Sequence, residues 1–178
     1  MAETTANKVA DFIILFCHEH GDLITNLHLQ KLVYYAQAWY LAWHEKPLFD
    51  EDFQAWISGP VQPELYDRFK HYRWEPINEH PEVELPKEIE EHLLKIMAIY
   101  CQYNYLELEP LVCDEDPWRL TRRGTSRTEH STAIIAKKLM LKYYQYLLDI
   151  EHDEEEEVKI SESPKTAESN IRETVKIG

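Results

Sequence analysis

Nine histidines and three cysteines give the chain the residue types that most often bind transition metals. The densest group is Cys17-His18-Glu19-His20, but no second pair of ligands follows at zinc-finger spacing, and no HExxH motif is present. On a helix, His18 and His20 would point in different directions. We therefore predict neither a metal site nor a cofactor.

A second candidate for chemistry is the run of carboxylates Asp114, Glu115 and Asp116. Acid–base catalysis needs an environment that separates the pKa values of two such groups, and adjacency alone does not indicate one. Asp116-Pro117 is more typical of a turn that leads into a short helix. Cys113 could act as a nucleophile only as a thiolate, and neither a GxSxG motif nor a Ser-His-Asp group is indicated. The sequence thus predicts a protein that is not an enzyme.

The segment from Arg119 to Arg127 is the only basic patch that the sequence suggests. Guanidinium groups there could bind phosphate, nucleic acid or the carboxylates of a partner. A glycine-rich phosphate loop is missing, and the chain has only four glycines, so a nucleotide site is not expected. Two interpretations stay open: partner binding by Arg119, Arg122 and Arg123, or an exposed loop that neutralises neighbouring acids.

Composition restricts the class of protein further. The formal net charge of −14 argues against a protein that binds nucleic acid by neutralising phosphates. Three cysteines, an odd number without a CxxC pair, suit a reducing cytoplasm better than a disulfide framework. We see no signal peptide and no apolar run long enough to span a membrane. We therefore expect a cytoplasmic protein with no membrane partner.

Residues 26–44 form the most aromatic segment, which is predicted to be one helix with apolar side chains on most sides. Its main stripe repeats at spacings of three and four residues and consists of Leu29, Leu32, Val33, Ala36, Tyr40 and Trp43. Tyr34 lies off this stripe and Tyr35 lies at its margin. Because neither suits a solvated face, a partner or another helix of the same domain must cover them.

The other patterns predict a mainly α, compact domain with a small β element. Further helices are expected from Thr5 to His20, over 63–73, from Pro86, within 107–118, and from a cap at Ser131. A short strand from Phe53 to Ile57 is expected to stop at Gly59-Pro60, and residues 74–86 are predicted to be a surface loop. Trp39, Trp56 and Phe69 are expected to point inward.

The composition changes after Asp149. Residues 151–178 hold four basic and nine acidic side chains and few apolar ones, which is typical of a segment that does not fold alone. We therefore predict a folded domain at 1–150 and a disordered acidic C-terminal tail at 151–178.

Four blocks of the sequence resemble the Panacea antitoxin domain, the family that includes SocA-type antitoxins and phage-associated GepA-like proteins. The blocks are ANKVADFIILF, TNLHLQKLVYYAQAWYLAWHEKPLF, FQAWISGPVQPELYDRFKHY and LEPLVCDEDPWRLTRRG. The second block contains the Leu-Gln-Lys-Leu run of the family, and the third contains its Gly-Pro-Val turn. In the fourth block the family has a Thr-His pair before an acid and Pro-Trp, and this chain has Val112-Cys113 instead. The likeness covers about residues 5–147.

The resemblance implies the antitoxin of a bacterial or prophage toxin–antitoxin pair, which neutralises its toxin by direct protein contact. Partner contact is then expected at the aromatic helix and the Gly-Pro-Val turn. The residues predicted to contact the toxin are Tyr34, Tyr35, Gln37 and Pro60. One alternative is an adaptor that delivers the toxin to a cytoplasmic ATP-dependent protease. Another is a DNA-binding regulator, although the helix at 26–44 offers only Lys31 as a full positive charge.

Overall fold

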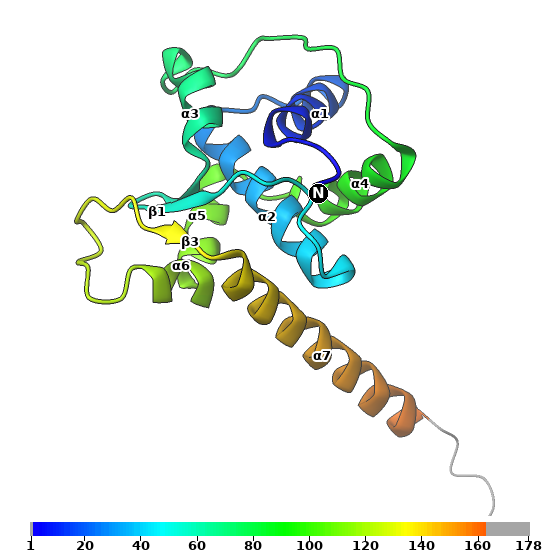
Figure 1. Cartoon of the computed structure of the whole chain (residues 1–178). Helices are drawn as coiled ribbons and strands as arrows, with labels where there is room; N and C mark the ends of the chain where they lie inside the picture. Colours follow the sequence, from blue (N-terminus) through cyan, green and yellow to red (C-terminus); the bar gives the residue numbers. More distant parts are fainter. Residues whose placement is uncertain (1, 163–178) are drawn as a thin grey trace, which may run out of the picture. The chain divides into compact units, whose positions relative to one another are not determined.

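The computed structural model describes residues 2–162, with side chains for residues 2–153, and shows a mainly helical chain with one small antiparallel sheet. The elements are α1 (Ala6–Glu19), α2 (Asn26–His44), β1 (Phe53–Trp56), β2 (Gly59–Val61), α3 (Pro63–Phe69), a 3₁₀ turn (Lys70–Tyr72), α4 (Lys87–Tyr100), α5 (Tyr105–Asp114), α6 (Asp116–Thr121), β3 (Ile134–Ile135) and α7 (Lys137–Glu162) (Figure 1). The chain forms two compact units, the first ending at Gln145 and the second beginning at Tyr146.

Helix α2 is the central element of the first unit. It contacts α1, α3, α4, α5 and β2, and Figure 1 shows it passing between these elements. Fifteen of its nineteen residues are buried, and they include the polar residues Asn26, Gln30, Lys31 and Gln37. The hydroxyl of Thr25 accepts a hydrogen bond from the backbone N–H of His28 and so caps the first turn. The expectation of a helix that is covered on most sides is confirmed.

The sheet has the strand order β2-β1-β3 and is antiparallel throughout. The prediction that Gly59-Pro60 only terminates a strand is wrong, because these residues form β2 and pair with Trp56 and Ala55 of β1. Pro60 has no N–H to donate, and it is tolerated here because β2 is an edge strand. Gly59 has a φ of +102°, a conformation that glycine adopts without strain.

Two predicted boundaries near the C-terminal half are also wrong. The last helix does not begin at Ser131, because Ile134 and Ile135 pair with β1 as β3, and the helix starts at Lys137. Two β-branched residues beside an unpaired strand edge complete the sheet there rather than open a helix. The segment 107–118 holds parts of two helices, since Pro117 opens α6 directly after α5.

Most of the predicted core is confirmed. Trp39 and Phe69 are buried, whereas Trp56 is only half-buried, on the outer face of β1 with its ring against Tyr66 at 4.9 Å between centroids. Residues 74–86 contain no helix or strand, as expected of a loop. Among the residues of α7 whose side chains are described, 137–153, Met140 and Tyr144 are fully buried.

Helix α7 continues to Glu162, so the first part of the segment that was predicted to be a disordered tail is helical. The acidic segment 151–160 can continue α7 once that helix is already formed, since extending a helix needs no new nucleus. The remainder of the predicted tail, 163–178, lies outside the described residues. No helix within residues 2–162 is long and apolar enough to cross a membrane.

Candidate functional site

Tyr34 and Tyr35, the first two residues chosen for partner contact, lie inside the fold with exposed fractions of 0% and 1%. The Tyr34 ring packs edge-on against Phe53 with 5.3 Å between centroids. The Tyr35 ring stacks on Tyr100 at 4.0 Å, and its hydroxyl donates a hydrogen bond of 3.1 Å to Glu115. The cover that these tyrosines require is therefore supplied by other elements of the same domain.

Gln37 and Pro60 are buried as well. The Gln37 amide donates to the carbonyl of Phe49 at 2.7 Å and accepts from the backbone N–H of Leu48 at 2.8 Å. It thus holds the chain that follows α2 against the middle of that helix. A partner could reach these four residues only if the domain rearranged. Their role in binding stays a prediction.

Glu115 joins α5, α6 and α7 to α2 through a carboxylate–phenol cluster. Its two carboxylate oxygens accept hydrogen bonds from the hydroxyls of Tyr35, at 3.1 Å, and Tyr144, at 2.5 Å. Burial raises the pKa of Glu115 to about 7, and the two phenol hydrogen bonds act in the opposite direction. The pKa of this carboxyl therefore lies near neutral pH, and the carboxylate accepts hydrogen bonds from two phenols.

Three of the blocks that carry the family resemblance meet at Lys31, Gly59 and Cys113, which we call the signature cluster. A Cβ atom on Gly59 would lie 2.9 Å from Cε and 3.1 Å from Nζ of Lys31, so only glycine leaves room for this lysine. Within residues 2–153, Lys31 Nζ is buried and has no hydrogen-bond partner. Burial lowers the pKa of Lys31 to about 8, and the nearby Cys113 and Glu109 oppose that shift.

Cys113 itself is buried, and burial raises its pKa to about 11. A thiol of that pKa is almost entirely protonated at neutral pH, which does not support the idea of a nucleophilic thiolate. In the described part of the chain, no three or more His, Cys, Asp or Glu residues form a group that could hold a metal ion.

The basic segment from Arg119 to Arg127 contains one buried arginine, Arg122, and three exposed ones. The Arg122 guanidinium is buried and donates to the backbone carbonyls of Ala55 at 2.7 Å, Ser126 at 2.8 Å and Glu129 at 2.5 Å. It therefore ties the loop after α6 to β1 and is not available as a surface contact. Arg119 and Arg123 are exposed, and Arg119 pairs with Asp116 at 2.6 Å.

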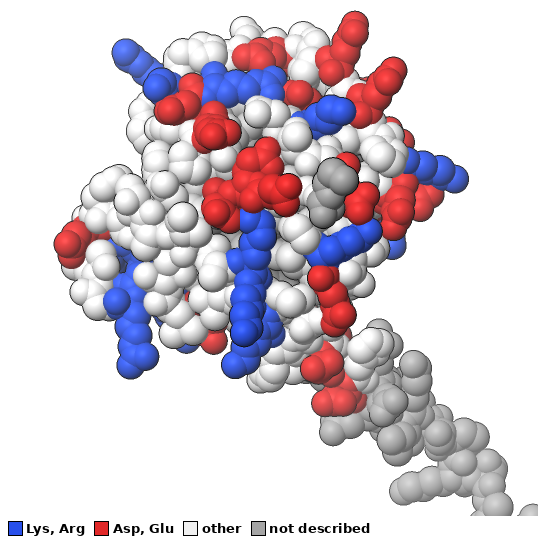
Figure 2. Space-filling model, viewed as in Figure 1, with Lys and Arg blue, Asp and Glu red and all other residues white. Residues whose placement is uncertain are grey.

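Residues 119–142 carry seven Lys or Arg side chains and one acidic side chain, Glu129, in a chain whose net charge is −14. We call the exposed members the basic surface: Arg119, Arg123, Arg127, Lys138 and Lys142. Figure 2 shows a column of basic side chains over the start of α7, directly below an acidic group. Residues 119–142 are thus a locally basic part of a negatively charged chain.

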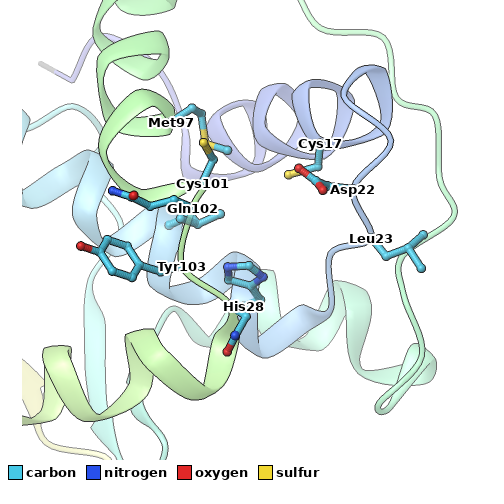
Figure 3. Close-up of a pocket in the computed structure, with 10 residues that line it drawn as sticks. Cys17, Asp22, Leu23, His28, Met97, Cys101, Gln102 and Tyr103 are labelled. Atoms are coloured by element: carbon cyan, nitrogen blue, oxygen red, sulfur yellow. The ribbon is translucent and has the colours of Figure 1, made fainter.

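A cavity of about 200 Å³ lies between the ends of α1 and α4 and the start of α2. Figure 3 shows Cys17 and Asp22 near the end of α1, Met97 and Cys101 at the end of α4, and His28 on α2 around this space. None of the residues chosen from sequence lines it. Its members come from three separate segments, and only a known arrangement of the helices could have brought them together.

Sequence reasoning also missed Lys31 and Glu115 as buried ionisable groups. A lysine within an otherwise apolar helix was a usable signal for Lys31, because a helix that is covered on most sides must bury it. Glu115 gave no such signal, because its phenol partners lie 80 and 29 residues away along the chain.

Comparison with known proteins gives two matches. The sequence model of the family described as "Antitoxin SocA-like, Panacea domain" matches residues 29–119, just over half of the chain. Antitoxin SocA of Caulobacter vibrioides (strain NA1000 / CB15N) is 46% identical over 46 residues, which are 26% of this chain and 24% of that protein. The chain therefore aligns with about a quarter of the length of this curated relative. No solved structure matches the chain.

Proposed function

Since this chain belongs to the SocA-like, Panacea-domain family of antitoxins, we propose that it is the antitoxin of a toxin–antitoxin pair and neutralises its toxin by binding it. The observation that carries the proposal is the family match over residues 29–119, which includes α2, the hairpin and the signature cluster. A role in binding rather than catalysis also fits the buried ionisable groups, because each of those described above lacks the companions that a catalytic site requires.

We place the toxin contact on the basic surface, and specifically on Arg119 and Arg123. Both side chains are exposed, and between them Leu120 is 44% exposed. Arginine is enriched where proteins bind each other, and it is frequent among the residues that contribute most to binding energy. A positive region on a negative protein would also orient an acidic toxin surface before contact. The cytoplasm is the compartment that we expect, because three cysteines without a CxxC pair suit a reducing environment.

The direct test is co-expression with the product of a small toxic reading frame beside the gene. Cells should grow, and the two proteins should co-purify with a dissociation constant in the nanomolar to micromolar range, about −8 to −12 kcal/mol. The double variant Arg119→Gln/Arg123→Gln should lose about tenfold or more in affinity while its urea midpoint stays unchanged. The matched control, Lys87→Gln/Lys95→Gln on α4, removes the same charge elsewhere and should bind normally.

Failure to protect cells and failure to co-purify with any neighbouring product would together refute the antitoxin proposal. Protection with an unaffected Arg119→Gln/Arg123→Gln variant would refute only the contact site. The adaptor alternative is tested in cells that lack the cytoplasmic ATP-dependent proteases. Masking of the toxin by direct binding should persist in these cells, whereas an adaptor would lose its protective effect.

A further inference from the structure

The cavity between α1, α2 and α4 is lined by chemistry that selects for a ligand. Its apolar lining includes Leu32 and Met97, and Leu23, which is 75% exposed, stands at its edge. The single formally charged residue that lines it is Asp22, which is exposed and whose charge acts on both Cys17 and His28. No lysine or arginine lines the space. The cavity is therefore apolar with one anionic group near its opening.

His28 supplies a second acceptor. Its Nε2 atom is buried and has no hydrogen-bond partner among the described residues. Burial lowers the pKa of this imidazole, so it is neutral at pH 7 and one ring nitrogen keeps a lone pair. The Gln102 amide donates to the carbonyl of Ile99, and Asn104 caps α5. Figure 3 shows the Tyr103 hydroxyl directed away from the space. Asp22 and His28 thus remain as the groups that could recognise a ligand.

The size of the cavity limits what it can hold. A volume of about 200 Å³ lies below the roughly 300–1,000 Å³ of sites for drug-sized ligands and suits a fragment or one long side chain. Apolar walls require an apolar stem, and two acceptors in a lining without Lys or Arg favour a donor head. A positive charge on that head is matched by Asp22, although the charge of Lys31 also reaches His28 from outside the lining. An anionic or purely apolar ligand would leave Asp22 or His28 without a matching group.

We propose that this cavity binds a primary ammonium or guanidinium group carried on a short apolar stem. The stem lies against Leu32 and Met97, and the head lies between Asp22 and His28. The same chemistry could come from a free small amine or from a lysine or arginine side chain of a protein partner. The proposal does not depend on the antitoxin function, because it rests on the cavity alone.

The test uses n-pentylammonium as the probe and the methyl signal of Met97 in ¹³C NMR as the readout, on the full chain. We expect saturable shifts with a dissociation constant in the millimolar range, as for a ligand of about six non-hydrogen atoms. The neutral probe n-pentanol has the same length and should bind more weakly. Asp22→Asn should lower the affinity for n-pentylammonium by about twofold to fivefold, which is the range for a solvent-exposed ion pair. Glu82→Gln removes an exposed acid from the 74–86 loop and should have no effect.

Two further variants separate binding from folding. Cys101→Phe places a ring at the exposed edge of the cavity and should abolish the shifts, whereas Cys101→Ser should keep them. His28→Phe retains a ring but removes the acceptor and the hydrogen bond with the Tyr103 backbone, so it should weaken n-pentylammonium binding and lower the urea midpoint slightly. If n-pentanol matches n-pentylammonium, or if Cys101→Phe leaves the shifts intact, the proposal is wrong.

The affinity of the Cys101→Phe variant for the cognate toxin distinguishes the two possible sources of the ligand. A loss of toxin affinity in Cys101→Phe would identify the ligand as a partner side chain, and an unchanged affinity would identify it as a free amine. Absence of any Met97 shift overturns the cavity proposal and leaves the antitoxin proposal intact, since that proposal is tested by growth and co-purification.

Discussion

Replacing Glu115 by Gln should make the stability of the protein less dependent on pH. Burial raises the pKa of this carboxyl from 4.5 to about 7, so the folded protein binds a proton that the unfolded chain has released between these values. The stabilising contribution of this proton is complete below pH 4.5 and is lost as pH rises through 7. A shift of about 2.5 pKa units corresponds to about 3 kcal/mol, an upper bound because the residue keeps some solvent exposure.

Glutamine keeps the shape of the side chain and stays neutral at every pH. Its amide can still accept a hydrogen bond from one of the two phenols, Tyr35 or Tyr144. At pH 5 the variant and the wild-type protein should therefore differ by less than about 1 kcal/mol. At pH 8.5 the variant should be the more stable of the two by about 2–3 kcal/mol, because the wild type then holds a buried charge.

Urea denaturation followed by tryptophan fluorescence at pH 5, 6, 7 and 8.5 measures these differences. Asp114→Asn is the matched control, because it removes a neighbouring carboxyl that is exposed and makes no contact with the phenols. Parallel curves of unfolding free energy against pH for wild type and Glu115→Gln would refute the reasoning. A destabilised variant at all pH values would show that the carboxylate–phenol bonds outweigh the burial of the charge.

The remaining predictions concern the signature cluster, α2 and the C-terminal segment. Lys31→Met should stabilise the protein by about 1–3 kcal/mol at pH 7, with the gain fading as pH rises from 8 to 10.5, because the folded lysine has a lowered pKa; calorimetry at pH 7 and 10 tests the sign. Gly59→Ala should lower the urea midpoint more than Gly124→Ala, since both glycines have positive φ but only Gly59 has Lys31 within 3 Å of the added Cβ; equal losses would exclude a role for the contact. Tyr34→Phe should keep both fold and toxin protection, because the Tyr34 hydroxyl lies near Tyr144 without completing a hydrogen bond; loss of protection with the fold intact would make Tyr34 an interface residue. A chain that ends at Ile150 should still protect cells in a growth assay, and loss of protection would make residues 151–178 a binding element.

The sequence allowed good predictions wherever a structural feature depends on local periodicity. The spacing of Leu29, Leu32 and Val33 identified α2. The failures occur where distant segments decide the outcome. Ile134 and Ile135 become a strand only because β1 offers them a partner edge, about eighty residues earlier in the chain.

The same distinction explains the site residues. Tyr34 and Tyr35 were correctly identified as residues that need cover, but the sequence alone left a partner and the same domain as equal alternatives. The structure supplies the cover from Phe53, Tyr100 and Tyr144, which come from three different elements. Arg122 was grouped with Arg119 and Arg123 by proximity in sequence, although its guanidinium binds backbone carbonyls and theirs face solvent.

The buried residues of the family blocks and the exposed residues that we propose for partner contact are therefore different sets. Lys31, Gly59 and Gln37 are buried or hold backbone together, so the family match describes a scaffold. A shared scaffold places few restrictions on its exposed side chains, and the basic surface extends past the end of the matched segment at Arg119. If the toxin contact lies on the basic surface, as we propose, two chains with this scaffold can fold alike and still bind different toxins, because α6 and the start of α7 can change their charge without disturbing α2.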